Sequence, residues 1–446
     1  MDALSARATT ALLTDKYELT MLQAALADGT AHRHSIFEVF TRRLSRGRRY
    51  GVVAGTGRIL EALPYFRFAD NDLAYLEASG FNQETLDYLR DYKFTGDIDG
   101  YAEGETFFPD SPVFQVRSTF AEGCILETLI LSILNFDSAI ASAASRMTSA
   151  AVDRPCLEMG SRRAHEQAAV AAARAAVIGG FVGTSNLEAG MRYGIDTIGT
   201  AAHAFTLLHD DELSAFQSQV EALGKDTTLL VDTYDVTQGV INAVKAAGPE
   251  LGAVRLDSGD LGVLAVEVRH QLDALGATNT KITVTSDLDE HAIAALAAFP
   301  VDSYGVGTSL VTGSGAPTSG MVYKLVARSD DEHPMRSVAK YSPNKGSVGG
   351  LKNAVRRYNA KGKAVEEVVA TGSPEKVSAW APTDGDARPL MVPLVVGGAV
   401  NSRWVGPNGV ELAAARHAES RSELPLRARQ LSGGDPAIPT TTVNLD

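Results

Sequence analysis

The chain has 446 residues, of which 45% are hydrophobic and 21% are charged, an ordinary composition for a globular protein. Its formal net charge of −13 argues against a general nucleic-acid surface, although a pocket in an acidic protein can still be locally positive. The N-terminus lacks the apolar core of a secretion signal, and no apolar run approaches the roughly 20 residues of a membrane span. The two cysteines, Cys124 and Cys156, are too few for a disulfide scaffold or a structural zinc site, so we expect a cytoplasmic protein.

The first part of the chain, residues 1–122, predicts an α+β domain. Residues 14–27 carry leucines at helical spacing and predict a helix that Thr14 or Asp15 caps. Residues 34–40 predict a strand. A basic cluster follows this strand and comprises Arg42, Arg43, Arg46, Arg48 and Arg49.

The central region, residues 123–311, alternates Ala-rich helical stretches with short apolar runs. The runs recur roughly every 16 to 32 residues, comparable with the ~30 residues per unit of a β/α-barrel. Alternation of this kind implies a parallel sheet. Asp287 with Glu290 forms the pattern of a capping box and predicts a helix start there. We therefore expect an irregular β/α-barrel as the catalytic domain.

The remaining part, residues 312–446, begins with a loop-like segment and is expected to pack on the N-terminal domain. It predicts a strand over residues 322–327, a Gly-rich turn with lysines over residues 340–350, and a helix near residues 412–429. The last 14 residues, 433–446, have the composition of a tail.

Polar residues follow the apolar runs of the central region. They are Glu158, Arg162, Thr184, Ser185, Asn186, Thr200, His203, Asp232, Asp235, Arg255, Asp257, Asp260, Ser286, Asp287, Gly305 and Gly307. An acidic residue after a strand is more often a helix cap than a catalytic group. Caps need neither Arg nor His, however, and the strand ends of a barrel share the rim where active sites lie. The whole set therefore predicts an active site.

Four of these residues have side chains suited to a particular chemistry. A lone histidine such as His203 most often makes a structural hydrogen bond, but an imidazole can accept a phosphoryl group if a carboxylate orients its other nitrogen. Asp232 is a candidate for that carboxylate. Arg255 suits a planar anion such as a carboxylate, and Asp257 suits ribose hydroxyls or a hydrated Mg²⁺.

Phosphate binding is predicted at Gly305 and Gly307, where the backbone can approach a phosphate closely ahead of a helix. Lys324, Lys340 and Lys345 are candidates for further phosphate contacts, although surface lysines are usually solvated. The sequence contains neither a P-loop motif nor a Cys/His cluster with metal-ligand spacing.

Eight segments, taken together and in this order, resemble nicotinate phosphoribosyltransferases. They are TDKYELTM (14–21), EMGSRRAH (158–165), GTSN (183–186), IGTAAH (198–203), VDTYD (231–235), RLDSGD (255–260), TSDLDE (285–290) and YGVGT (304–308). The resemblance runs from about residue 11 to past residue 345. It implies the irregular β/α-barrel of type II phosphoribosyltransferases with an additional α+β domain. Some members carry a cysteine-rich zinc element, and this chain has no cysteine after Cys156.

The resemblance implies an ATP-coupled reaction of NAD salvage (EC 6.3.4.21). Nicotinate, phosphoribosyl pyrophosphate, ATP and water give nicotinate mononucleotide, pyrophosphate, ADP and phosphate, with Mg²⁺ accompanying the polyphosphates and no dedicated protein ligands for the metal. The phosphohistidine of this reaction would be His203, with Asp232 as its partner.

The resemblance also implies substrate contacts. Arg255 would face the nicotinate carboxylate, Asp257 the ribose, and Arg162 and Asn186 the base or the pyrophosphate. The 5′-phosphate would be bound by Ser286, Asp287, Gly305, Gly307 and Thr308. Asp15 and Tyr17 would reach the neighbouring subunit's site in a homodimer, with Tyr17 stacking on the pyridine ring. The helix pattern alone favours a core position for Tyr17.

Three alternative functions remain. A related phosphoribosyltransferase could use nicotinamide, which has no carboxylate for Arg255 and would call for an acidic residue at Asn186, or quinolinate, whose enzymes are typically shorter and lack ATP coupling. The second alternative is an unrelated barrel lyase or isomerase acting on a sugar phosphate. The third is a nucleotide-binding protein without catalysis, which has no need of His203 beside Asp232.

Overall fold

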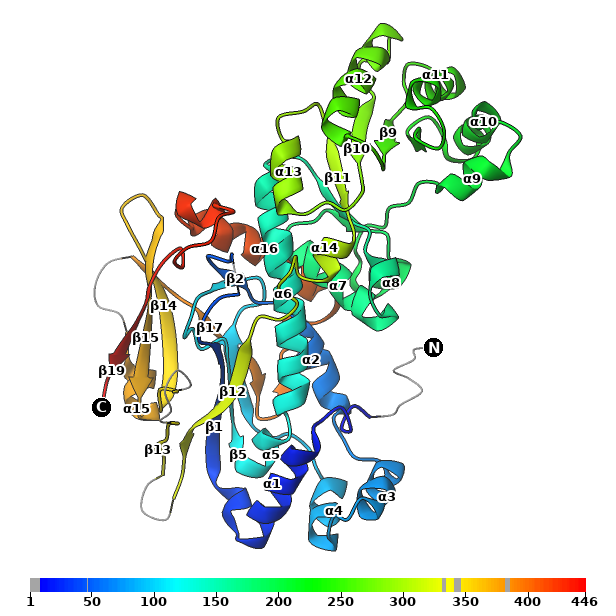
Figure 1. Cartoon of the computed structure of the whole chain (residues 1–446). Coiled ribbons are helices and arrows are strands. Elements are labelled where there is room, and N and C mark those ends of the chain that lie inside the picture. The colour runs from blue at the N-terminus through cyan, green and yellow to red at the C-terminus, as the bar shows by residue number, and fades with distance from the viewer. Residues whose placement is uncertain (1–8, 46, 331–333, 341–345, 382–385) are drawn as a thin grey trace. The chain divides into compact units, whose positions relative to one another are not determined.

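A computed structural model describes residues 9–45, 47–330, 334–340, 346–381 and 386–446, and the chain divides into two compact units. Unit 1 comprises Met1–Ser142 and Thr318–Asp446, and unit 2 comprises Ala143–Pro317. The first division falls inside the long helix α6 (Glu127–Ala151), which contributes to both units (Figure 1). The domain boundaries expected at residues 122/123 and 311/312 stay predictions.

The main sheet of unit 1 interleaves strands from both ends of the chain. In the described part of the unit its order is β13 (Arg336–Ser337), β12 (Met321–Arg328), β1 (His34–Thr41), β5 (Phe114–Thr119), β3 (Asp97–Tyr101), β17 (Met391–Val396) and β18 (Ala399–Val400). The strands expected at residues 34–40 and 322–327 are β1 and β12, and they pair with each other in antiparallel fashion. Because β12 and β17 flank the N-terminal strands, the C-terminal part shares one core with the N-terminal part.

A second sheet of unit 1 holds the end of the chain. Its order in the described residues is β16 (Ala387–Pro389), β14 (Leu351–Tyr358), β15 (Ala364–Gly372) and β19 (Thr440–Asn444). A separate two-stranded sheet pairs β2 (Gly51–Val52) with β4 (Thr106–Phe107). β19 runs parallel to β15. The prediction of a tail over residues 433–446 is therefore wrong, because a partner strand about 70 residues earlier gives this polar segment its hydrogen bonds.

The helices of unit 1 within the described residues are α1 (Lys16–Ala27), α2 (Thr56–Ala62), α3 (Asp70–Ala78), α4 (Gln83–Arg90), α5 (Phe120–Cys124), α15 (Pro374–Ala379) and α16 (Gly406–Glu423). α16 ends earlier than the helix expected to reach residue 429, because Pro425 follows and a short 3₁₀ turn (Leu426–Arg429) takes over. By length and composition α6 is the described helix that could cross a membrane, but 72% of its apolar stretch is buried inside the protein, as expected for a core helix.

A buried ionic network ties the second sheet to the loop before β4. Arg356 of β14 donates to Glu105 at 2.6 Å and to Glu367 of β15 at 2.9 Å, and Arg388 donates to Glu105 at 2.8 Å. Tyr101 of β3 donates to the other oxygen of Glu367 at 2.6 Å. Burial by itself raises the pKa of Glu105, but the two guanidinium groups outweigh burial and hold the pKa at about 2.

Unit 2, which the structure describes throughout, is built on one parallel sheet. Its six strands run in the order β7 (Gly183–Thr184), β6 (Cys156–Glu158), β11 (Ser303–Val306), β10 (Lys281–Val284), β9 (Ala253–Leu256) and β8 (Thr228–Leu230). The sheet curls but does not close, so it forms a half-barrel. This confirms the expected α/β fold of the type II phosphoribosyltransferase kind.

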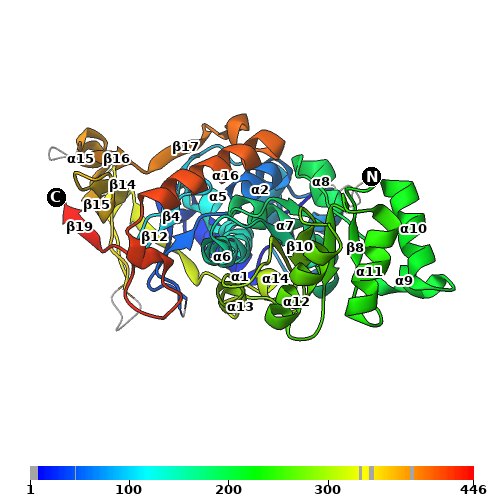
Figure 2. The ribbon, with the colours of Figure 1, turned by 90° about the horizontal axis from the view of Figure 1, so that it is seen from above.

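Helices connect these strands as the expected alternation requires. They are α7 (Glu166–Ile178), α8 (Leu187–Tyr193), α9 (His203–Leu208), α10 (Glu212–Leu223), α11 (Val236–Ala247), α12 (Leu261–Ala274), α13 (Glu290–Leu296) and α14 (Thr308–Val311). Helices α10, α11 and α12 pack side by side in chain order next to β8 and β9 (Figures 1 and 2).

Helix α13 does not begin as expected. Its N-cap is Asp289, whose carboxylate accepts from the backbone N–H groups of His291 at 2.9 Å and Ala292 at 2.8 Å. The capping box predicted from Asp287 is therefore wrong, because a turn over Ser286–Leu288 delays the helix. Glu290 is instead buried and bonded to Arg146 at 2.9 Å, and Asp287 is left exposed.

Candidate active site

The carboxyl ends of β6 to β11 meet at one edge of the half-barrel, because all six strands are parallel. We call the loops that follow these strands the rim. Glu158 ends β6 with its carboxylate buried, accepting from the Thr184 hydroxyl at 2.5 Å and from the backbone N–H of Gly160. Burial raises the pKa of this carboxyl although both donors oppose the rise. Glu158 thus fastens the loops after β6 and β7 to each other.

His203 is the first residue of α9, and its ring is held from the loop after β8. Its Nδ1 lies 3.1 Å from the hydroxyl of Thr233. Asp232, the expected partner, instead accepts from the backbone N–H of Asp257 at 2.9 Å and from the Ser258 hydroxyl at 2.8 Å. The hydrogen bond recorded for His203 therefore goes to the neighbour of the predicted residue.

Thr233 was missed by sequence reasoning. The signal available for it was its place in VDTYD, directly after Asp232 and at the end of an apolar run. The other oxygen of Asp232, Oδ1, is buried and has no hydrogen-bond partner in the described part of the chain. Such an oxygen can receive a further donor, so Asp232 stays available to a ligand or to a rotated His203.

Arg255 extends from β9 into the segment that precedes His203. Its Nη1 donates to the Thr200 hydroxyl, and its Nη2 donates to the carbonyl oxygen of Ala201 at 3.1 Å. Its Nε is buried and has no hydrogen-bond partner among the residues described. Burial lowers the pKa of Arg255. The negative charges of Asp257 and Asp232 oppose this lowering of the pKa, whereas the positive charge of Arg162 adds to it.

Two guanidinium groups thus lie close enough at the rim to repel each other. No ion pair to a carboxylate is recorded for either Arg255 or Arg162 within unit 2, and Arg162 is exposed in a 3₁₀ turn (Ser161–Arg163). Two arginines without a recorded ion pair favour an anion at this part of the rim, and a planar carboxylate matches the geometry of a guanidinium.

Asn186 holds the turn that carries Arg162. Its Nδ2 donates to the Ser161 hydroxyl at 3.0 Å, while its Oδ1 accepts from the backbone N–H of Ala189 at 2.9 Å and caps α8. Asn186 therefore joins two loops of the rim whether or not it also contacts a substrate.

Two acidic residues of the predicted set are helix caps. Asp235 accepts from the backbone N–H of Gln238 at 2.8 Å at the start of α11, and Asp260 accepts from that of Val263 at 3.2 Å at the start of α12. The general preference of Asp for caps explains both.

The ends of β9 and β10 are fastened through Asp257, whose carboxylate accepts from the Thr285 hydroxyl. The next residue, Ser286, has a φ of 127°, which is unfavourable for any residue with a side chain. Backbone strain of this kind persists where the surroundings impose it, and it concentrates at functional sites. Ser286 and Asp287 are both exposed at the rim.

Gly305 within β11 and Gly307 directly after it differ in their surroundings. A Cβ on Gly305 would lie 2.5 Å from Cγ2 of Thr285 and 2.7 Å from Sδ of Met159, so packing already requires a glycine there. Gly307 has open space, with its nearest neighbour, the Met159 carbonyl oxygen, at 3.5 Å. Gly307 precedes Thr308, the exposed first residue of α14. Close approach by a phosphate is therefore easier at Gly307.

The remaining predicted residues belong to unit 1. Asp15 occupies the N-cap position of α1 without a side-chain cap bond in the described structure, and Tyr17 is 45% exposed, so the core position favoured by the helix pattern is wrong. Lys324 lies 3.9 Å from a Glu127 oxygen and donates to its neighbour's carbonyl oxygen at 2.6 Å. Lys340 is exposed, and Lys345 lies outside the described residues.

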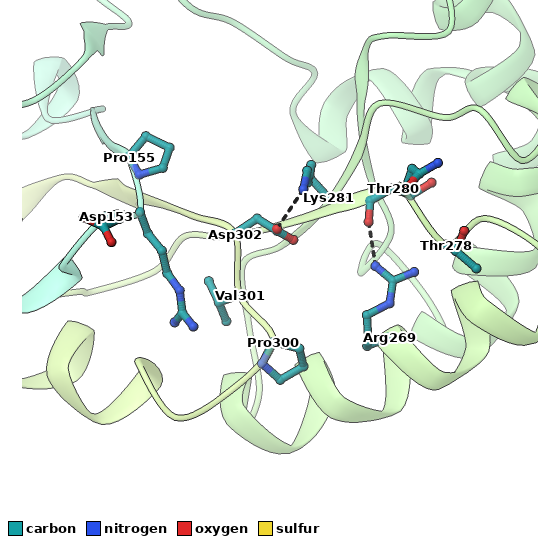
Figure 3. Close-up of a pocket in the computed structure, with 11 residues that line it drawn as sticks. Asp153, Pro155, Arg269, Thr278, Thr280, Lys281, Pro300, Val301 and Asp302 are labelled. Carbon is teal, nitrogen blue, oxygen red and sulfur yellow. Dashed lines mark hydrogen bonds and ion pairs between the residues drawn. The ribbon is translucent and has the colours of Figure 1, made fainter.

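A cavity of about 530 Å³ lies at the opposite, amino-terminal edge of the sheet (Figure 3). Its cations have protein partners: Lys281 pairs with Asp302 at 3.3 Å, and Arg269 donates to the Thr280 carbonyl oxygen at 2.7 Å. None of the predicted site residues lines it. Across the described chain, no group of three or more His, Cys, Asp or Glu side chains is placed to hold a metal ion.

Comparison with known proteins decides the family. The profile of the nicotinate phosphoribosyltransferase N-terminal domain matches residues 12–135. The nicotinate phosphoribosyltransferase pncB1 of Mycobacterium tuberculosis (strain ATCC 25618 / H37Rv) is 58% identical over 443 residues, covering 97% of this chain and 95% of the relative. The chain belongs to the nicotinate phosphoribosyltransferase family.

Other family members agree in sequence and in fold. The nicotinate phosphoribosyltransferase of Bacillus subtilis (strain 168) is 40% identical over 360 residues, covering 78% of this chain and 73% of the relative. The crystal structure of human nicotinic acid phosphoribosyltransferase superposes with a TM-score of 0.80, covering 97% of each chain at 23% identity. At 23% identity, the likeness to the human protein is evidence for the fold of this chain and not for its function.

Proposed function

We propose that this protein is a nicotinate phosphoribosyltransferase of NAD salvage, which joins nicotinate to phosphoribosyl pyrophosphate. The observation that carries the proposal is the pair Arg255 and Arg162, which have no recorded ion pair within unit 2 and include the unpartnered Nε of Arg255; their positive charges suit the carboxylate of nicotinate. Nicotinamide lacks this charge, and an uncharged amide beside two arginines would leave their repulsion in place. Asn186, a neutral residue at the same rim, is consistent with this choice.

The sugar phosphate would bind beside the base. Asp257 lies at the end of β9, where its carboxylate can accept from ribose hydroxyls. The exposed Ser286 and Asp287 follow β10, and the exposed Thr308 follows Gly307 at the end of the neighbouring strand β11. These residues would hold the 5′-phosphate at the open backbone of Gly307, with Gly305 supporting the loop. Mg²⁺ would enter bound to the polyphosphates, as part of the substrates rather than in a protein cage.

The glycosyl transfer itself needs positioning more than proton transfer. The C1–O bond to pyrophosphate breaks with its electron pair leaving on the oxygen, and the pyridine nitrogen donates its lone pair to C1. The transition state has oxocarbenium character, so the protein must orient the base and stabilise the leaving charge. In this proposal Arg255 of the rim orients the base, and Asp257 positions the ribose beside it.

ATP would be coupled through His203. A ring nitrogen attacks the γ-phosphorus, an N–P bond forms, and the O–P bond to ADP breaks. Water later displaces the nitrogen and releases phosphate, which restores the histidine. Thr233 holds the ring for this attack, and the unpartnered Oδ1 of Asp232 lies in the same loop after β8. The protein would then be the ATP-coupled ligase, EC 6.3.4.21.

A homodimer would complete the site. Tyr17 and Met21 of α1 and Leu13 in the turn before it are exposed apolar side chains, at 45%, 39% and 48%. Exposed apolar side chains also lie on α8 (Leu187 and Met191) and α9 (Leu207 and Leu208), the helices that follow loops of the rim. Apolar surface at α1 and at these two helices is suited to burial between two copies. Asp15 and Tyr17 would reach the rim of the partner, with Tyr17 on the pyridine ring, in a cytoplasmic enzyme.

Turnover with nicotinate, nicotinamide and quinolinate, each with and without ATP, tests the proposal. We expect nicotinate mononucleotide from nicotinate, with ATP increasing the yield, and at most trace products from the other two bases. With γ-labelled ATP, the wild-type protein should carry an acid-labile phosphate that His203→Ala lacks. Equal turnover of nicotinamide, or labelling retained in His203→Ala, would contradict the substrate and the histidine assignment respectively.

A further inference from the structure

The two segments proposed to hold the 5′-phosphate follow neighbouring strands of the half-barrel. One is the loop after β10, with Ser286 and Asp287, and the other is the segment after β11, with Gly307, Thr308 and the short helix α14. Because β10 and β11 pair with each other in parallel fashion, the sheet fixes where both segments begin. Their far ends lie beyond the strands, so their separation there depends on other contacts.

A buried carboxylate, that of Glu290, joins these far ends. Glu290 is the first residue of α13 and directly follows the loop after β10. Its Oε1 accepts from Nε of Arg146 in α6 at 2.9 Å, and its Oε2 accepts from the hydroxyl of Ser314. Ser314 lies in the turn after α14, and its backbone N–H donates to the carbonyl oxygen of Ser309 in that helix at 2.6 Å. The carboxylate therefore ties the start of α13 to the end of the segment that carries Thr308.

Ser314 has a backbone conformation that favours glycine. Its φ is 50°, between Gly313 at 68° and Gly315 at 78°, so three successive residues lie in the left-handed region. A third glycine would adopt this conformation with less strain, but it would lack the hydroxyl that bonds to Glu290. Strained residues of this kind persist where the surroundings impose them, and they are concentrated at functional sites.

We propose that Glu290 and Ser314 are positioning residues for the 5′-phosphate of phosphoribosyl pyrophosphate. Their bond holds the loop after β10 and the segment after β11 at the separation at which both can contact one phosphate. Arg146, itself buried, supplies the charged partner that a buried carboxylate needs. The proposal rests on the proposed function, since it presumes that a sugar phosphate binds between these two segments.

Ser314→Gly tests this role, because glycine adopts the left-handed conformation readily and only the hydroxyl is lost. Glu290→Ala is less suitable, since it would leave Arg146 buried without this partner and would lower stability. For Ser314→Gly we expect the KM for phosphoribosyl pyrophosphate and the Kd of ribose 5-phosphate, measured by calorimetry, to rise about fivefold, because a hydrogen bond to a charged group is lost. The melting temperature should stay near that of wild type.

Ligands without a 5′-phosphate separate positioning from a general loosening of the rim. The KM for nicotinate and the Kd of pyrophosphate should change less than about twofold in Ser314→Gly, and kcat at saturating substrates should be unchanged. Ser432→Gly makes the same change at an exposed bend of unit 1 and should behave as wild type.

Two results would overturn the positioning role. One is wild-type affinity of Ser314→Gly for ribose 5-phosphate, and the other is an equal loss of affinity for ribose 5-phosphate and pyrophosphate. Failure of the proposed function is distinct from both, because the wild-type protein itself would then form no nucleotide from nicotinate.

Discussion

Nδ1 of His203 and the hydroxyl of Thr233 lie 3.1 Å apart, and this contact joins the first residue of α9 to the loop after β8. It fixes the rotation of the imidazole ring without a charged partner. The hydroxyl can donate to Nδ1 or accept from it, according to the tautomer of the ring.

Thr233→Val should slow the phosphorylation of His203 by about fivefold, since a lost hydrogen bond of ~1 kcal/mol no longer fixes the ring. The measurement is the initial rate at which γ-labelled ATP places acid-labile phosphate on the protein. Thr233→Ser, which keeps the hydroxyl, should label at nearly the wild-type rate. Equal rates for valine and threonine would assign the orienting role elsewhere, with Asp232 as the first candidate.

Arg255→Ala should raise the KM for nicotinate by about 10 to 100-fold and that for phosphoribosyl pyrophosphate much less, because a charged hydrogen bond to the carboxylate is lost. Steady-state kinetics with each substrate varied in turn give both values. Arg163→Ala removes an exposed arginine two positions after Ser161 and serves as the control. Equal effects of Arg255→Ala on both constants would place this side chain outside the base site.

Glu105→Gln should destabilise unit 1 by ~3 kcal/mol at pH 7, because Arg356 and Arg388 lower the pKa of this carboxyl to about 2. The folded pKa lies below the unfolded one, so this stability is present above about pH 4.5 and is lost as the pH falls toward 2. Urea unfolding of both proteins should show a difference that shrinks between pH 5 and pH 3. A difference independent of pH would mean that packing, and not charge, accounts for the loss.

Glu18→Gln should have the opposite pH dependence. Burial raises the pKa of Glu18 to about 7, although its carboxylate accepts from the backbone N–H of Thr128 at 2.9 Å and from the Thr14 hydroxyl. The folded pKa lies above the unfolded one, so stability from this group is present below about pH 4.5 and is lost as the pH rises through 7. The variant should therefore gain melting temperature relative to wild type between pH 5 and pH 8. A constant offset across this range would show that Glu18 does not titrate there.

The alternation of helices and short apolar runs in residues 123–311 was enough to predict a parallel sheet, and with it the rim. The spacing of apolar residues is a local property, and the common direction of parallel strands places their ends together whatever the details. For the same reason β1 and β12 were predictable as strands. Their pairing with each other, across nearly 300 residues, was not visible in either segment.

Tertiary structure decided everything that depends on which distant group lies opposite another. The strand β19 exists because β15 supplies its hydrogen bonds, and Tyr17 is 45% exposed because Leu19 and Leu22 occupy the face of α1 that is buried in the core. The same contrast between sequence and tertiary structure holds for His203. Its place at the rim follows from its sequence position after an apolar run, whereas its bond to Thr233, not Asp232, depends on side-chain directions in two loops that only the folded sheet brings together.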